Sequence, residues 1–164
     1  MLGPGTLLLR RFLEQALEWL VIALMAALAA VVIAGVGFRK FGNPLVWYDE
    51  LAPILLAWLT YYAACLAALN RAHIGFTKLV DAMPRSARLA VTAFRELCVV
   101  GFFALAAWAG WKVQLVLEGE ALVSLPWFPA AAARSVIPIS SILFIVAELI
   151  AYVEWLARQE EREA

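Results

Sequence analysis

The feature that most constrains this chain is a series of four long apolar runs. Two of them, Trp19 to Phe38 and Leu51 to Asn70, contain no Asp, Glu, Lys or Arg over their full length. The other two, residues 97–117 and 136–155, have a similar length and carry only isolated charges. An α-helix needs about 20 mostly apolar residues to cross the hydrocarbon core of a bilayer. The sequence therefore predicts four transmembrane helices.

The composition argues against most other classes of protein. Of the 164 residues, 65% are hydrophobic and 16% are charged, against about 45–50% and about 25% in ordinary soluble domains. So few charged side chains cannot cover a soluble core of this size, and a disordered chain would be more polar. The 13 basic and 13 acidic residues cancel, so the chain lacks the basic excess of a nucleic-acid binder. We expect one all-α membrane domain over residues 1–164, embedded in the lipid bilayer, with no cofactor and no nucleic acid.

The lysines and arginines predict the orientation of the helices. Four spans place both termini on one side of the membrane. With the termini inside, nine basic residues lie on the inner side and four on the outer side. The four outer ones are Arg39, Lys40, Lys112 and Arg134. Since basic residues are enriched in cytoplasmic segments, we predict cytoplasmic termini.

Two segments outside the apolar runs have the pattern of short helices that lie in the membrane interface. Phe76, Leu79, Val80 and Met83 follow the spacing i, i+3, i+4, i+7 of an amphipathic helix. The N-terminal stretch Leu7 to Leu17 has apolar residues that suit a second helix in the membrane interface.

Prolines shape the last connection and the start of the fourth span. Residues 118–134 contain Pro126 and Pro129, which disfavour a regular spanning helix and predict an outer loop. Pro138 either lies near the start of the fourth span or kinks a helix that begins earlier.

Few side chains in this sequence could carry out chemistry. His73 is the only histidine, so two histidines of this chain cannot hold a haem. It lies with Arg71 just past the inner end of the second span, and both are candidates for contact with another subunit. Lys112 is near the end of the third span, from where it can extend its ammonium to the headgroups.

Glu148 lies about twelve residues into the fourth span. An intramembrane carboxylate is a functional candidate by default, and two interpretations stay open. It either makes a structural hydrogen bond between helices or takes part in transport, although the sequence places no second titratable group at its depth.

Asp49 and Glu50 open the second span on the outer side. Negative charge is favoured near a helix N-terminus, so a charged helix start is one interpretation. A contact with a partner's cation and a cation-binding site are the other two. Together with the nearby Trp47 and Trp58, which suit a subunit interface, these carboxylates form a candidate contact region.

Short motifs along the chain carry a family resemblance. The motifs are Pro44, Trp47-Tyr48-Asp49-Glu50, Trp58, Ala63-Ala64, Arg71, His73-Ile74, Ser124-Leu125-Pro126-Trp127 and Ile137-Pro138-Ile139. They resemble the small, DctQ-type permease subunit of tripartite ATP-independent periplasmic (TRAP) transporters, and the likeness extends over nearly the whole chain.

The resemblance implies a role in the bacterial inner membrane. Such a subunit works with a large membrane transport subunit, which holds the substrate and sodium sites, and with a periplasmic substrate-binding protein. It braces the scaffold of the large subunit and is not an enzyme. The implied partner interface comprises Trp47, Asp49, Glu50, Trp58, Arg71 and His73, and typical substrates are organic acids.

Two other functions stay open at this point. One is a membrane anchor subunit of a respiratory or redox complex, which the single histidine disfavours. The other is an independent small transporter, which would need Glu148 or Lys112 to act in transport.

Overall fold

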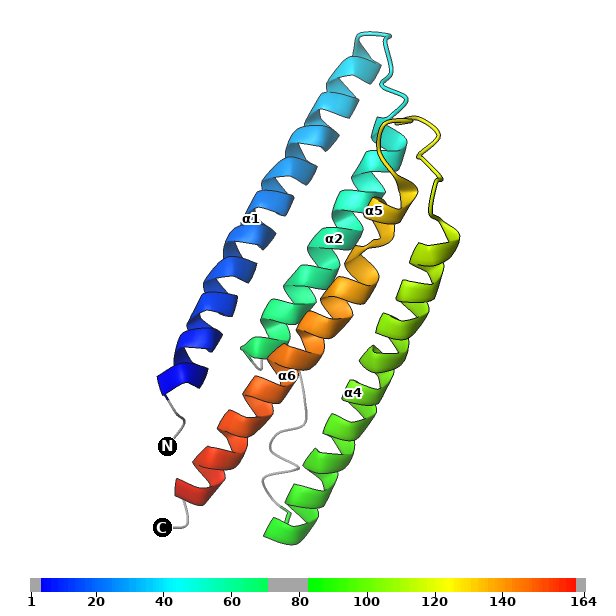
Figure 1. Cartoon of the computed structure of the whole chain (residues 1–164). Coiled ribbons are helices and arrows are strands. Elements are labelled where there is room, and N and C mark those ends of the chain that lie inside the picture. The colour runs from blue at the N-terminus through cyan, green and yellow to red at the C-terminus, as the bar shows by residue number, and fades with distance from the viewer. Residues whose placement is uncertain (1–3, 71–82, 162–164) are drawn as a thin grey trace.

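The computed structural model describes residues 4–70 and 83–161. Within these ranges, four helices are long and apolar enough to cross a membrane, which confirms the all-α membrane class (Figure 1). The helices are α1 (Pro4–Lys40), α2 (Tyr48–Leu69), α4 (Arg85–Val116), the short α5 (Ala130–Arg134) and α6 (Val136–Glu161).

The four long helices form an open layer. α1 packs against α2, α2 against α6, and α6 against α4, so α1 and α4 lie at the two edges (Figure 1). In the span Ala130–Ala157, which contains α5 and most of α6, 44% of the most apolar stretch is buried inside the chain, against 11% in each of the other three spans. α6 is therefore the central element, and the edge helices expose most of their apolar surface.

The hydrophobic core joins three helices of the layer. Its buried members are Leu17, Cys65, Ala68, Leu69, Phe144 and Ala147, from α1, α2 and α6. The fourth long helix joins through Phe103 of α4, whose ring stacks on that of Phe144 with 3.9 Å between centroids.

The two ends of the layer differ. The first turn of α1 and the last turn of α6 lie at the same end, which we call the terminal end (Figure 1). The connections 41–47 and 117–129 lie at the opposite end, which we call the loop end. This arrangement agrees with an even number of spans, and the assignment of the terminal end to the cytoplasm stays a prediction.

The helices extend beyond the apolar runs at the terminal end. The expectation of a separate interfacial helix over Leu7 to Leu17 is wrong, because α1 runs unbroken from Pro4 to Lys40. Residues 7–17 contain no Gly or Pro and are rich in strong helix formers. Leu13 and Leu17 also pack into the core, so tertiary contacts hold this part of the helix against its neighbours. The interfacial helix predicted from Phe76 to Met83 falls, apart from Met83, outside the described residues.

The segment expected as a loop over residues 118–134 contains the short helix α5. A break at Ser135 separates α5 from α6, and Pro138 lies three residues later, in the first turn of α6. Proline has no N–H to donate to the carbonyl of Arg134, four residues before it. α6 thus begins at Val136 with Pro138 in its first turn, as one of the two alternatives predicted, and α5 precedes it as a separate short helix.

Gly110 lets α4 approach this break closely. A Cβ added there would lie 2.9 Å from Ile137 Cγ2 and 2.9 Å from Pro138 Cδ. Only a residue without a side chain fits at this crossing, and small residues commonly mark close helix packing in membranes.

Candidate subunit interface

The residues around the start of α2 lie at the loop end. Trp47 is half-buried and precedes the helix, and its carbonyl accepts the Leu51 N–H at 3.0 Å. Asp49 is exposed, and its carboxylate lies 3.9 Å from Arg39 Nη2 of α1. Both side chains of this pair are more than two-thirds exposed, so its contribution to stability is small. Asp49 is therefore accessible to a partner.

Glu50 has a partner within the chain. Its Oε2 accepts the backbone N–H of Ser124 at 2.9 Å and also accepts the Ser124 hydroxyl. Hydrogen bonds to an ionised acceptor are stronger than bonds between neutral groups. The first turn of α2 is thus bound to the connection between α4 and α5, a contact that the sequence did not indicate.

Trp58 and Cys65 continue the same line of contacts along α2. The Trp58 indole N–H donates to the carbonyl of Ala133 at 2.8 Å, one of the last carbonyls of α5, which a helix end leaves available. The Cys65 thiol donates to the carbonyl of Ser140 in α6 with a sulfur–oxygen distance of 3.3 Å. The sequence separations of the three pairs, with Glu50 first, are 74, 75 and 75 residues. The offset is nearly constant because α2 runs parallel to the segment 124–140. We call these three contacts the α2 stripe.

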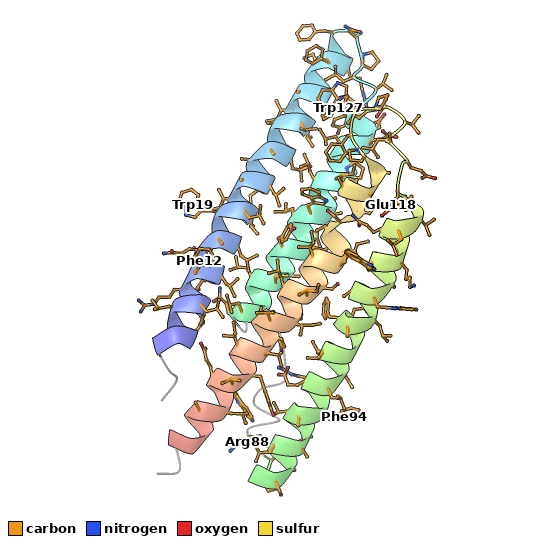
Figure 2. The ribbon with its side chains drawn as sticks, viewed as in Figure 1. Phe12, Trp19, Arg88, Phe94, Glu118 and Trp127 are labelled. Atoms are coloured by element: carbon orange, nitrogen blue, oxygen red, sulfur yellow. The ribbon has the colours of Figure 1, made fainter. Side chains whose placement is uncertain are left out.

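The connection 117–129 has a defined backbone structure. The Leu122 N–H donates to the Phe128 carbonyl at 3.1 Å, and the Ala130 N–H donates to the Glu120 carbonyl at 2.9 Å. Leu125, within this connection, is buried. The Val123 and Trp127 side chains, in contrast, are 91% and 77% exposed, and Figure 2 shows Trp127 at the loop end.

The connection between α1 and α2 adds two more exposed apolar side chains at this end, Phe41 and Val46. We call the four residues Phe41, Val46, Val123 and Trp127 the loop-end surface. Exposed apolar side chains gathered at one end of a chain suit contact with another protein or with the membrane interface.

Glu148 lies away from these contacts, at the middle of α6. Its carboxylate accepts a hydrogen bond from Arg95 Nη2 of α4 at 2.7 Å, and the same nitrogen contacts Glu96. The expectation that Glu148 lacks a second titratable group at its depth is therefore wrong. Arg95 precedes the apolar run 97–117, but α4 begins ten residues before it and carries it to the level of Glu148.

A second ion pair binds α6 to the other edge of the layer. Arg10 Nη1 of α1 lies 2.8 Å from Glu154 Oε2, and the Glu154 side chain is 10% exposed. Carboxylates of α6 thus contact an arginine from each edge helix, which fixes the depth of α1 and α4 relative to the central helix.

The remaining candidates do not join one site. Lys112 is exposed on α4 near the loop end, while Arg71 and His73 lie outside the described residues. Among residues 4–70 and 83–161, no group of three His, Cys, Asp or Glu side chains could hold a metal ion. The described residues thus form exposed surfaces that could contact a partner, together with polar contacts that join neighbouring helices.

Comparison with known proteins adds a family to this geometry. Residues 28–158 match the family described as "Tripartite ATP-independent periplasmic transporters, DctQ component". The chain is 31% identical over 94 residues to the sialic acid TRAP transporter small permease protein SiaQ of Vibrio cholerae. It is 28% identical over 90 residues to the sialic acid TRAP transporter permease protein SiaT of Haemophilus influenzae.

These two matches cover only part of each protein. The alignment with SiaQ covers 57% of this chain and 54% of the relative, and that with SiaT covers 54% of this chain and 15% of the relative. The chain thus matches about half the length of the small relative and a minor part of the larger one.

Proposed function

This chain belongs to the family of DctQ components of tripartite ATP-independent periplasmic transporters, and from this premise we propose that it braces the scaffold of a large transport subunit. It is a small permease subunit, a multi-pass protein of the bacterial inner membrane and not an enzyme. The family gives no support to the alternative of a membrane anchor in a redox complex.

The observation that carries the bracing role is the open layer of helices. A helix layer with exposed apolar side chains on its edge helices and on α6 offers broad surfaces to lipid or to another membrane protein. The buried carboxylates Glu148 and Glu154 each contact an arginine of a neighbouring helix, which suits a rigid scaffold better than a transport path.

The match to SiaT supports a large membrane partner. The similar region makes up 15% of that permease, so a segment like this chain occurs there within one larger polypeptide. We propose that the present chain associates non-covalently with a subunit that corresponds to the rest of such a permease.

The substrate and the driving ion follow from the family resemblance. Both relatives are named as sialic acid transporters, and we propose organic acids as the substrate class and sodium as the coupled ion. The substrate and sodium sites would lie in the large subunit, and a periplasmic binding protein would deliver the substrate to the loop end.

The roles of the candidate residues follow from their geometry. Trp47 and Asp49 are accessible enough to contact a partner directly. Glu50 and Trp58 contribute indirectly, because both hold segments of this chain in place. Arg71 and His73, which lie outside the described residues, remain candidate contacts.

Co-purification tests the proposal. We expect the affinity-tagged chain, expressed in its native host, to retain a much larger multi-span membrane protein in mild detergent. Trp58→Ala should weaken this retention, whereas Glu118→Gln, which changes an exposed side chain beyond the end of α4, serves as the control. Purification of the chain alone from cells with full uptake would contradict the bracing role.

A further inference from the structure

The connection 117–129 is held both by its own backbone hydrogen bonds and by a contact with α2. Backbone hydrogen bonds join its two halves, from Leu122 to Phe128 and from Ala130 to Glu120. The contact between Glu50 and Ser124 binds it to α2. Ser124 lies directly beside Val123, the most exposed residue of the loop-end surface, and three residues before Trp127. The carboxylate of Glu50 therefore acts on the part of the connection that carries the exposed side chains.

Glu50 differs from the other members of the α2 stripe in what it binds. Trp58 and Cys65 donate to carbonyls of α5 and α6, where the helices already order the backbone. Glu50 accepts two hydrogen bonds from Ser124, one from its backbone N–H and one from its hydroxyl, and Ser124 lies in a connection that is not helical. Without Glu50, the connection around Ser124 would consequently lose its hydrogen bonds to α2. Without Trp58 or Cys65, the carbonyls of Ala133 and Ser140 would still be held by the helices that contain them.

We propose that Glu50 is a positioning residue, a latch that holds the connection 117–129 in one conformation through Ser124 and so presents Val123 and Trp127 as an ordered surface. Its consequence for transport rests on the proposed function, in which the binding protein docks at the loop end. A surface ordered before contact loses less conformational entropy on binding. The latch thus strengthens docking of the binding protein without entering the transport step.

Spin labelling tests the latch itself. A nitroxide on Cys introduced at Val123, in a chain whose exposed Cys98 is replaced by Ala, reports the mobility of the connection in the purified complex. We expect Glu50→Ala to increase this mobility clearly and Ser124→Ala to increase it less, because the backbone N–H remains. Ser124→Ala should add little once Glu50 is replaced, and Glu50→Gln, whose amide oxygen can still accept, should restore part of the order.

The matched control is Glu118→Gln, which removes one exposed carboxylate at the same end without touching Ser124. It should leave the mobility at Val123 unchanged. Equal mobility in Glu50→Ala and the unsubstituted chain would overturn the latch. If Glu50→Ala fails to assemble, the same comparison with Ser124→Ala decides the matter.

Uptake measurements in proteoliposomes, without the spin label, separate this proposal from the proposed function. We expect the apparent KM for the binding protein to rise several-fold in Glu50→Ala, with kcat at saturating binding protein unchanged. A general folding defect would instead lower kcat. Increased mobility with an unchanged KM would uphold the latch and refute docking of the binding protein at this surface.

Discussion

Replacement of the two partners of the Arg95–Glu148 contact should have unequal effects on stability. One arginine contacts two carboxylates, Glu96 and Glu148, and their side chains are only 7% and 8% exposed. The Arg95 side chain is 51% exposed, so solvent or headgroups can still solvate it. Replacement of the arginine therefore removes a contact from two buried carboxylates at once, whereas replacement of Glu148 removes one contact from a half-exposed arginine.

The structure sets the size of this difference. Removal of one partner from a fully buried ion pair costs about 3–5 kcal/mol, but hydrogen bonds between membrane helices average about 0.6 kcal/mol with a maximum near 1.7. Because Arg95 is half-exposed, we expect Arg95→Gln to lower the free energy of unfolding by about 2 kcal/mol, between these limits. Glu148→Gln keeps a hydrogen-bonding group and leaves Arg95 with Glu96, so it should cost about 0.5 kcal/mol.

Unfolding of the purified chain in mixed micelles, followed by far-UV circular dichroism as the denaturing detergent increases, measures both changes. The double variant should be more stable than Arg95→Gln alone, since it removes one of the buried carboxylates. Arg39→Gln, which breaks the exposed contact with Asp49, is the control and should change stability little. The reasoning is refuted if Glu148→Gln costs as much as Arg95→Gln.

Three further predictions follow from the fold. Gly110→Ala should destabilise the chain by about 1–3 kcal/mol in the same assay, because its Cβ has no room; Gly101→Ala, which meets nothing within 4 Å, should be neutral or slightly stabilising. Trp58→Phe keeps most of the ring but loses the donor to α5, and should cost about 1 kcal/mol, whereas an unchanged midpoint would mean that this hydrogen bond does not stabilise the fold. For topology, a membrane-impermeant maleimide should label Cys at Val123 in whole spheroplasts and Cys at Ser86 only after permeabilisation, both without Cys98; the reverse pattern would place the termini outside.

The family assignment depended on features that lie close together in the sequence. The aromatic and acidic residues that open α2, with Pro44 before them, and the proline motif that opens α6 were recognisable without a structure. The family match over residues 28–158 confirms that interpretation. The partners of these residues could not be read in the same way, since Glu50 and Ser124 are 74 residues apart.

The sequence alone determined the number of long helices, because the apolar length needed to cross a bilayer is a local property of each run. It also predicted the start of the fourth helix at residue 136, where the apolar run and Pro138 coincide. Hydropathy marks where a chain crosses the membrane, however, and not where its backbone stops being helical. For this reason α1 and α4 begin well before their apolar runs.

Only the tertiary structure decided which polar groups meet. Arg95 reaches Glu148, Arg10 reaches Glu154, and Glu50 reaches Ser124, because the relative depth of distant helices brings each pair to the same level. That depth is set by the packing of α6 between its neighbours, including the space left at Gly110. A single sequence does not specify this relative depth, since the apolar surfaces of these helices could be buried in the membrane equally well at several relative depths.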